Sequence, residues 1–151
     1  PQVMSQVAKN EVDYIWTTIA NVEELGRVRM EAMECFLDDF EQGKAEGRYR
    51  QASLPALPFA DAEFELALCS HYLFLYSAHV DQAQHILSML ELCRVAKEVR
   101  VYPLLSLDGN QSVHLEPVIS QLKKNGFEVA LQTVLYQFQK GETEMLVVKR
   151  A

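Results

Sequence analysis

The chain has 151 residues and a formal net charge of −7, from 14 basic and 21 acidic residues. This length suits a single domain, and 49% hydrophobic with 23% charged residues is typical of a soluble globular protein. The negative charge argues against a general nucleic-acid-binding protein, which needs a basic face. No apolar run approaches the roughly 18 residues that cross a membrane, so we expect no membrane partner.

Two helices are predicted within residues 1–47. The first is indicated by apolar residues at helical spacing, namely Val12, Ile15, Trp16 and Ile19. Asn21 followed by Glu24 is a capping-box pattern and predicts the start of the second helix. The apolar stripe of this second helix consists of Leu25, Val28, Ala32, Phe36 and Phe40. The pair is expected to form a helical hairpin that either packs as part of a core or acts as a lid over a ligand.

From Arg48 onward the pattern changes to that of an α/β fold. Tyr49–Ser53 is predicted as a short strand, and Pro55 and Pro58 enforce a turn after it because each fixes φ and lacks a backbone donor. Phe64–Cys69 is a continuous apolar run, which is typical of a strand covered on both faces.

Helices and strands alternate over the rest of the chain. Ser77 is expected to cap a helix that runs to about Lys97, and Val99–Leu105 is the next buried strand. A further helix ends at the Lys-Lys-Asn-Gly sequence 123–126. The last two strands are expected to form an antiparallel hairpin: Phe127–Leu135 and Glu144–Lys149. This order predicts one α/β domain with a mostly parallel sheet and right-handed crossovers.

The sequence from Leu57 to His71, LPFADAEFELALCSH, resembles a known family. It is similar to the fourth-strand region of class I S-adenosylmethionine-dependent methyltransferases, which reads roughly LPF-x-D-x-x-F-D and then a hydrophobic run. The resemblance covers about residues 49–150. The sequence of residues 66–76 also resembles that of a bacterial subgroup of methyltransferase-like proteins, which have a two-helix insert before the third strand. The resemblance implies part of a Rossmann-like sheet and methyl transfer from S-adenosylmethionine to an unidentified small-molecule acceptor.

Candidate site residues follow from this resemblance and from the rule that ligands bind outside the carboxyl ends of strands in open α/β sheets. The candidate cofactor-binding residues are Ser53, Leu54, Ser70 and His71. The candidate substrate-binding residues are Tyr72 and Arg29. His71 has three open interpretations, as a general base, as a residue lining the pocket, or as a structural histidine. We assign no catalytic residue, because methyl transfer depends mainly on proximity and in-line geometry.

The chain departs from the family at the cofactor anchor. Family members hold the methionine part of the cofactor on a glycine-rich turn after their first strand, and bind the ribose through an acidic residue after their second. Here the early glycines Gly26, Gly43 and Gly47 are scattered around helices, and Ser53 stands where the family often has an aspartate. We therefore expect a fragment of a longer protein, incomplete by itself for cofactor binding.

A missing first strand has a consequence for the Phe64–Cys69 strand. In the family these two strands lie side by side, so the apolar edge of Phe64–Cys69 is expected to lack its partner and to be prone to strand addition. We expect either Tyr49–Ser53 or a second copy of the chain, as a homodimer, to cover that edge. A second function therefore stays open, a non-catalytic module that self-associates through this edge or through the Met-rich helices.

The three cysteines, Cys35, Cys69 and Cys93, lie in apolar stretches without a CxxC pair, so we expect small buried hydrophobic residues. Their odd number, without a signal-peptide pattern, fits a reducing compartment, and we expect a cytoplasmic protein. The histidines do not combine with acidic residues or cysteines at ligand spacing, so no metal site is predicted.

Overall fold

The computed structural model describes residues 2–137 and 140–150 of the chain. These residues divide into two compact units, one of residues 2–51 with residue 140, and one of residues 52–137 with 141–150. The boundary lies close to the predicted change of pattern at Arg48. The expectation of a single domain over residues 1–151 stays a prediction, and each unit is described by itself.

The second unit is a four-stranded sheet with helices, which confirms the predicted α/β class. Its strands lie in the order β1-β2-β4-β3, and they span Phe64–Ser70 (β1), Ala96–Tyr102 (β2), Phe127–Thr133 (β3) and Glu144–Arg150 (β4). β1 and β2 pair in parallel, whereas β4 runs antiparallel to both β2 and β3. The predicted hairpin is confirmed. The prediction of a mostly parallel sheet is wrong for the strand pairing. Only the β1–β2 ladder is parallel among the described strands, because β4 returns between β2 and β3.

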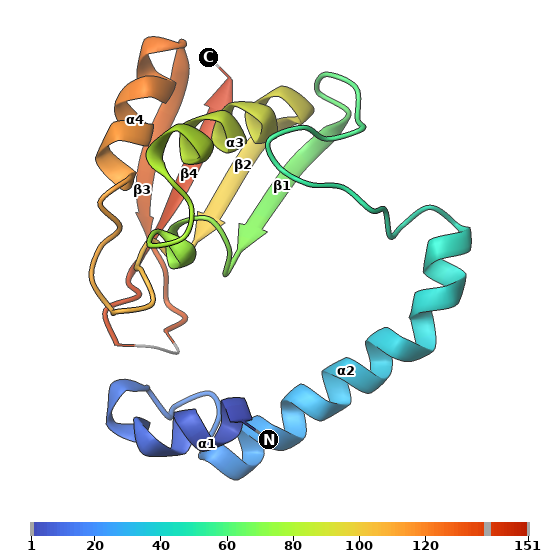
Figure 1. Ribbon diagram of the computed structural model, residues 1–151, viewed down its shortest axis with the longest axis vertical. Coiled ribbons are helices and arrows are strands. Elements are labelled where there is room, and N and C mark those ends of the chain that lie inside the picture. The colour runs from blue at the N-terminus through green and yellow to red at the C-terminus, as the bar shows by residue number, and fades with distance from the viewer. Residues whose placement is uncertain (1, 138–139, 151) are drawn as a thin grey trace. The chain divides into compact units, whose positions relative to one another are not determined.

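Helices α3 (Gln82–Val95) and α4 (Leu115–Lys124) lie on the same face of the sheet (Figure 1). β1, β2 and β3 point in the same direction. Right-handed crossovers from β1 to β2 and from β2 to β3 therefore place both helices on one side of the sheet. The core lies beneath them. Its largest fully buried side chains are Leu73, Phe74, Met89, Val99, Val101, Leu115, Val118, Leu122, Leu146 and Val148.

The opposite face of the sheet is open at β1, so the prediction of a strand covered on both faces is wrong. Ala67 and Cys69 face the helices, and Cys69 is buried. The alternate residues are exposed, Phe64 by 38%, Leu66 by 42% and Leu68 by 70%. The apolar run predicts burial of both faces of β1, but both crossover helices cover the face that carries Ala67 and Cys69.

The predicted start of α3 at Ser77 is also wrong. The Asp81 side chain caps the helix by accepting a hydrogen bond of 2.8 Å from the amide of Gln84. Ser77 instead donates to the carbonyl of Phe74 at 2.6 Å, where residues 74–76 form a short 3₁₀ turn. α3 ends two residues earlier than predicted, because β2 begins at Ala96.

The first unit contains α1 (Gln2–Lys9), a 3₁₀ turn at Glu11–Asp13 and the long helix α2 (Val22–Ala45). The helix predicted across residues 12–19 does not form, and the backbone is already extended at Tyr14. Five β-branched residues lower helix propensity there: Val12, Ile15, Thr17, Thr18 and Ile19.

The capping box that was predicted to start α2 is confirmed. Asn21 Oδ1 accepts from the amide of Glu24 at 2.9 Å, and the Glu24 carboxylate accepts from the amide of Ala20 at 2.6 Å. α2 ends at Ala45, shortly before Gly47, whose φ of +76° lies in the left-handed region that favours glycine.

The strand predicted at Tyr49–Ser53 does not form either, so it does not cover the edge of β1. The Tyr49 ring packs against Phe36 and Phe40 of α2, with ring centroids 5.3 and 5.6 Å away. Its hydroxyl donates to Asp39 at 2.6 Å. A Cβ atom at Gly43 would lie 2.3 Å from this ring, so the glycine makes room for it. Tyr49 thus belongs to the surface of α2.

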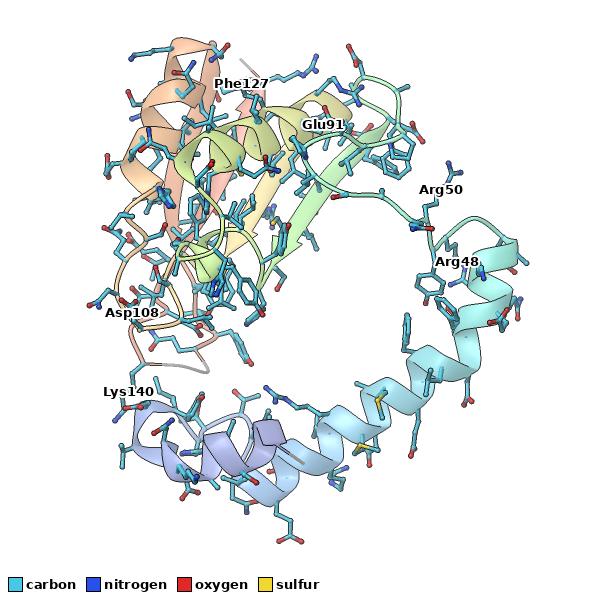
Figure 2. The ribbon with its side chains drawn as sticks, in the orientation of Figure 1. Arg48, Arg50, Glu91, Asp108, Phe127 and Lys140 are labelled. Carbon is cyan, nitrogen blue, oxygen red and sulfur yellow. The ribbon has the colours of Figure 1, made fainter. Side chains whose placement is uncertain are left out.

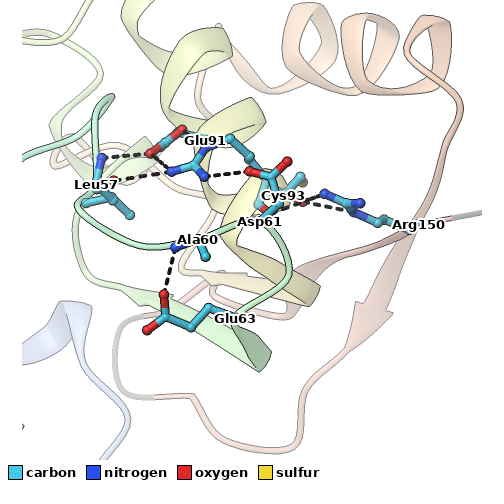
Figure 3. A network of polar contacts seen from close by, with 8 residues as sticks. Leu57, Ala60, Asp61, Glu63, Glu91, Cys93 and Arg150 are labelled. Carbon is cyan, nitrogen blue, oxygen red and sulfur yellow. Dashed lines mark hydrogen bonds and ion pairs between the residues drawn. The ribbon is translucent and has the colours of Figure 1, made fainter.

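The turn that precedes β1 is attached to the end of α3 by a network of polar contacts that includes Leu57, Asp61 and Glu91 (Figure 3). Arg94 donates to both carboxylate oxygens of Glu91 at 2.8 Å and to Asp61 at 2.7 Å. Its guanidinium also reaches the carbonyl of Leu57 at 3.2 Å, while the amide of Leu57 donates to Glu91 at 2.7 Å. The amide of Ala62 donates to the Arg94 carbonyl at 2.8 Å. These bonds determine where β1 begins.

The pH dependence of stability tests this network through Glu91→Gln. Hydrogen bonds from Arg94 lower the pKa of Glu91, so its contribution is present above the unfolded carboxyl's pKa of about 4.3 and is lost as the pH falls. Urea unfolding at pH 7 should show the variant less stable by about 1–2 kcal/mol. This difference should shrink below about pH 4. The control is Glu116→Gln, because Glu116 is exposed on α4. A stability difference for Glu91→Gln that does not depend on pH would contradict the role given to Glu91.

Gly126 offers a test of the end of α4. Its φ of +82° lies in the left-handed region, which is unfavourable for residues with a Cβ atom. A Cβ atom placed there would have no other atom within 4 Å, so a steric clash is excluded. Gly126→Ala should therefore lower the free energy of unfolding by about 1 kcal/mol through backbone strain alone. Gly126→Asn should lower it less, since asparagine tolerates this region. Urea unfolding curves measure both, and an unchanged Gly126→Ala protein would refute the left-handed turn.

Candidate functional site

Ser70 and His71 lie at the carboxyl end of β1, as the sequence predicts. Ser70 Oγ is 2.7 Å from His71 Nδ1, so the two side chains share a hydrogen bond. His71 has a φ of +53°, and its amide donates to the carbonyl of Tyr102 at 2.8 Å. Its ring stands edge-on to the Tyr102 ring, with centroids 5.9 Å apart. The carboxyl ends of β1 and β2 are thereby joined through His71.

Tyr102, at the end of β2, connects this pair to a buried carboxylate. Its hydroxyl lies 3.2 Å from Glu142 Oε2 and 3.2 Å from the carbonyl of Tyr136. Glu142 is 4% exposed. Burial first, and then the neighbouring Glu142 carboxylate, raise the pKa of Tyr102. The phenol is therefore protonated at neutral pH and acts as a donor.

Neither Tyr102 nor Glu142 is predicted as a site residue from the sequence. The apolar pattern predicts a strand that continues to Leu105, whereas the strand ends at Tyr102. The signal was Pro103, which has no amide to donate to a ladder and so ends the strand. Glu142 is separated from Tyr102 by 40 residues, and no sequence pattern joins them.

Ser53 and Leu54 form a turn beside α3. The Ser53 carbonyl accepts from the amide of Ala56 at 3.1 Å, and the Leu54 carbonyl accepts from Gln84 Nε2 at 3.2 Å. Gln84 lies in the first turn of α3, which follows the carboxyl end of β1. Leu54 therefore lies toward the same end of the sheet as Ser70. That these residues share one ligand stays a prediction.

The two candidate substrate-binding residues lie in different units. Tyr72 follows β1 directly, is 46% exposed, and has its ring 6.5 Å from that of Tyr76. Arg29 lies on the exposed surface of α2 in the first unit. Tyr72 is thus near the Ser70 and His71 pair along the chain, and the role of Arg29 in a substrate site stays a prediction.

A pocket of about 340 Å³ opens between the loops that follow β1 and β2. The amide of Leu107 donates to the carbonyl of Leu75 at 3.0 Å and joins the two loops. Asp108 lies in the second loop (Figure 2), and hydrogen bonds from Asn110 lower the pKa of Asp108. It is therefore ionised at neutral pH. The pocket is lined by Leu75, Ser77, Ala78, His79, Ser106, Leu107, Asp108 and Val113.

Two other histidines have structural surroundings. His85 is completely buried, with Nδ1 2.8 Å from the carbonyl of Asp81 and Nε2 3.0 Å from that of Leu73. His114 Nε2 lies 3.2 Å from the carbonyl of Ser77. Among residues 2–137 and 140–150, no three His, Cys, Asp or Glu side chains are grouped so that they could hold a metal ion.

The cysteines are partly as expected. Cys69 and Cys93 are buried, and burial raises the pKa of both thiols, to about 12 for Cys93, so both are protonated at neutral pH. The prediction that Cys35 is buried is wrong, because it lies on an exposed part of α2.

Comparison with known proteins gives one relative of unknown activity. The chain is 24% identical over 163 residues to an uncharacterised protein of Methanocaldococcus jannaschii, and the match covers 99% of this chain and 71% of the relative. No protein-family model matches the chain, and no solved structure matches it significantly. In the part of the chain that the structure describes, no helix has both the length and the apolar character to cross a membrane.

Removing the Tyr102 hydroxyl tests the polar connection at the ends of the strands. Tyr102→Phe deletes a donor to the buried Glu142 carboxylate, and we expect a loss of about 1–2 kcal/mol in the free energy of unfolding. Tyr76→Phe, an exposed tyrosine in the same unit, should change it by less than about 0.5 kcal/mol. Equal effects in urea unfolding would show that the Tyr102 hydroxyl makes no special contact.

Proposed function

We propose that the protein is methyltransferase-like and takes part in S-adenosylmethionine-dependent methyl transfer to a small-molecule acceptor in the cytoplasm. The observation that carries the proposal is the pairing of Ser70 with His71 at the carboxyl end of β1, beside Tyr102 at the end of the parallel neighbour β2. Ligands of open α/β sheets bind outside this end. The helix–strand–strand ending, α4-β3-β4, agrees with the pattern that the sequence resemblance implies.

The side chains at this end suit the adenosyl part of the cofactor. Ser70, His71 and Ser53 supply hydrogen-bonding groups, and Leu54 supplies apolar surface next to α3. The described residues do not include a glycine-rich turn that would hold the methionine part of the cofactor. The glycines with positive φ are Gly47, Gly109, Gly126 and Gly141, and each is in a turn rather than directly behind a strand that leads into a helix. We therefore propose that this chain alone holds only part of the cofactor.

The acceptor is assigned to the neighbouring pocket of about 340 Å³. Its size is in the range of pockets for small molecules, and its apolar walls with few polar groups have the usual composition of such sites. Bound adenosylmethionine would supply the methyl group. The side chains of this chain would position the acceptor, with Ser106 and Asp108 as its polar partners.

Nuclear magnetic resonance tests the proposal residue by residue. Millimolar S-adenosylmethionine should shift the amide resonances of Ser53, Leu54, Ser70 and His71, with a dissociation constant of about 1 mM, equivalent to about 4 kcal/mol. Ser70→Ala should reduce the shifts, while Ser120→Ala, an exposed serine on α4, should not.

Two outcomes would contradict the proposal. An absence of shifts at these four residues would exclude the cofactor site at the end of β1. Micromolar affinity would instead show that the chain holds the whole cofactor, and would refute the partial site.

A further inference from the structure

The outer edge of β1 is unpaired in the described part of the chain. β1 is the first strand in the order β1-β2-β4-β3, and it pairs with β2 on one side. Apart from one charged residue, Glu65, the strand carries none of the features that usually protect an edge. Its sequence, FELALCS, contains no proline and no lysine, and it pairs with β2 over its whole length.

The exposed face of β1 is apolar along the same edge. Phe64, Leu66 and Leu68 point away from the helices and are 38–70% exposed. The single charged residue of the strand, Glu65, is on the opposite face and forms an ion pair with Lys97 of β2. An unpaired backbone edge beside exposed apolar side chains is a template for another strand.

We propose that a second copy of this chain adds its own β1 to this edge, antiparallel and about a two-fold axis. The strand is complementary to itself in that arrangement. With the axis at Ala67, Leu66 of each copy lies opposite Leu68 of the other, which forms two apolar pairs on the open face. Two four-stranded sheets thereby become one continuous sheet.

The charge pattern favours a second copy over an arbitrary partner. In the same register Glu65 lies opposite Cys69 of the other copy, so no like charges meet across the new ladder. A two-fold axis uses the same patch on both subunits, as most homodimers do. The proposal can be tested without S-adenosylmethionine, because the edge of β1 is separate from its carboxyl end. It concerns the same edge that the first strand occupies in the family that the sequence resembles.

Sedimentation velocity over a range of concentrations tests the proposal with two charge variants. Leu68 pairs with Arg100 in the register of β2, and Leu66 pairs with Glu98. In the monomer, the new charge of Leu68→Glu therefore lies beside Arg100 and that of Leu66→Lys beside Glu98. In the dimer, each new charge lies opposite a leucine of the other copy. The wild type should sediment as a dimer of the 17.2 kDa chain, and each variant should weaken dimerisation at least tenfold, equivalent to about 1.4 kcal/mol.

Leu37→Glu on α2 is the matched control, because Leu37 is 58% exposed and belongs to the other unit. It should leave the dimer unchanged. Circular dichroism checks that all the variants are folded. A wild-type monomer at hundreds of micromolar would overturn the proposal. Loss of the dimer in Leu37→Glu, or its persistence in both β1 variants, would overturn the edge as the interface and favour α2 instead.

Discussion

The hydrogen bonds of Arg94 determine where β1 lies, and the candidate site depends on that strand. One guanidinium contacts Glu91 on its own helix and Asp61 and the Leu57 carbonyl in the turn before the strand. Because several bonds converge on this turn, β1 enters the sheet in one register against β2. At the opposite end the amide of His71 bonds to the carbonyl of Tyr102. β1 is thus fixed at both ends, while its outer edge and one face stay open.

This arrangement gives one strand two separate surfaces. The carboxyl end carries hydrogen-bonding groups, which suit a polar ligand, and it lies near a pocket between two loops that a backbone bond joins. The edge carries exposed leucines, which suit another strand. A ligand-binding role and a self-association role therefore use different atoms of β1. The first strand that the family resemblance implies would compete with the second copy for the edge.

Local signals in the sequence predict the features that depend on neighbouring residues. The capping box at Asn21, the end of α4 before Gly126 and the β3–β4 hairpin are such features. Features that depend on distant contacts were missed. Packing of a loop side chain on the preceding helix was missed as well, because Tyr49 is predicted as a strand residue but its ring packs beside Gly43 on α2. Glu142 reaches Tyr102 across 40 residues.

A crystal structure of the protein grown with millimolar S-adenosylmethionine tests the central claim most directly, namely that the carboxyl end of β1 binds the adenosyl group. The account predicts electron density for that group against Ser70, His71 and the turn at Leu54. An ordered carboxyl end without such density, or a ligand bound elsewhere on the chain, would contradict it.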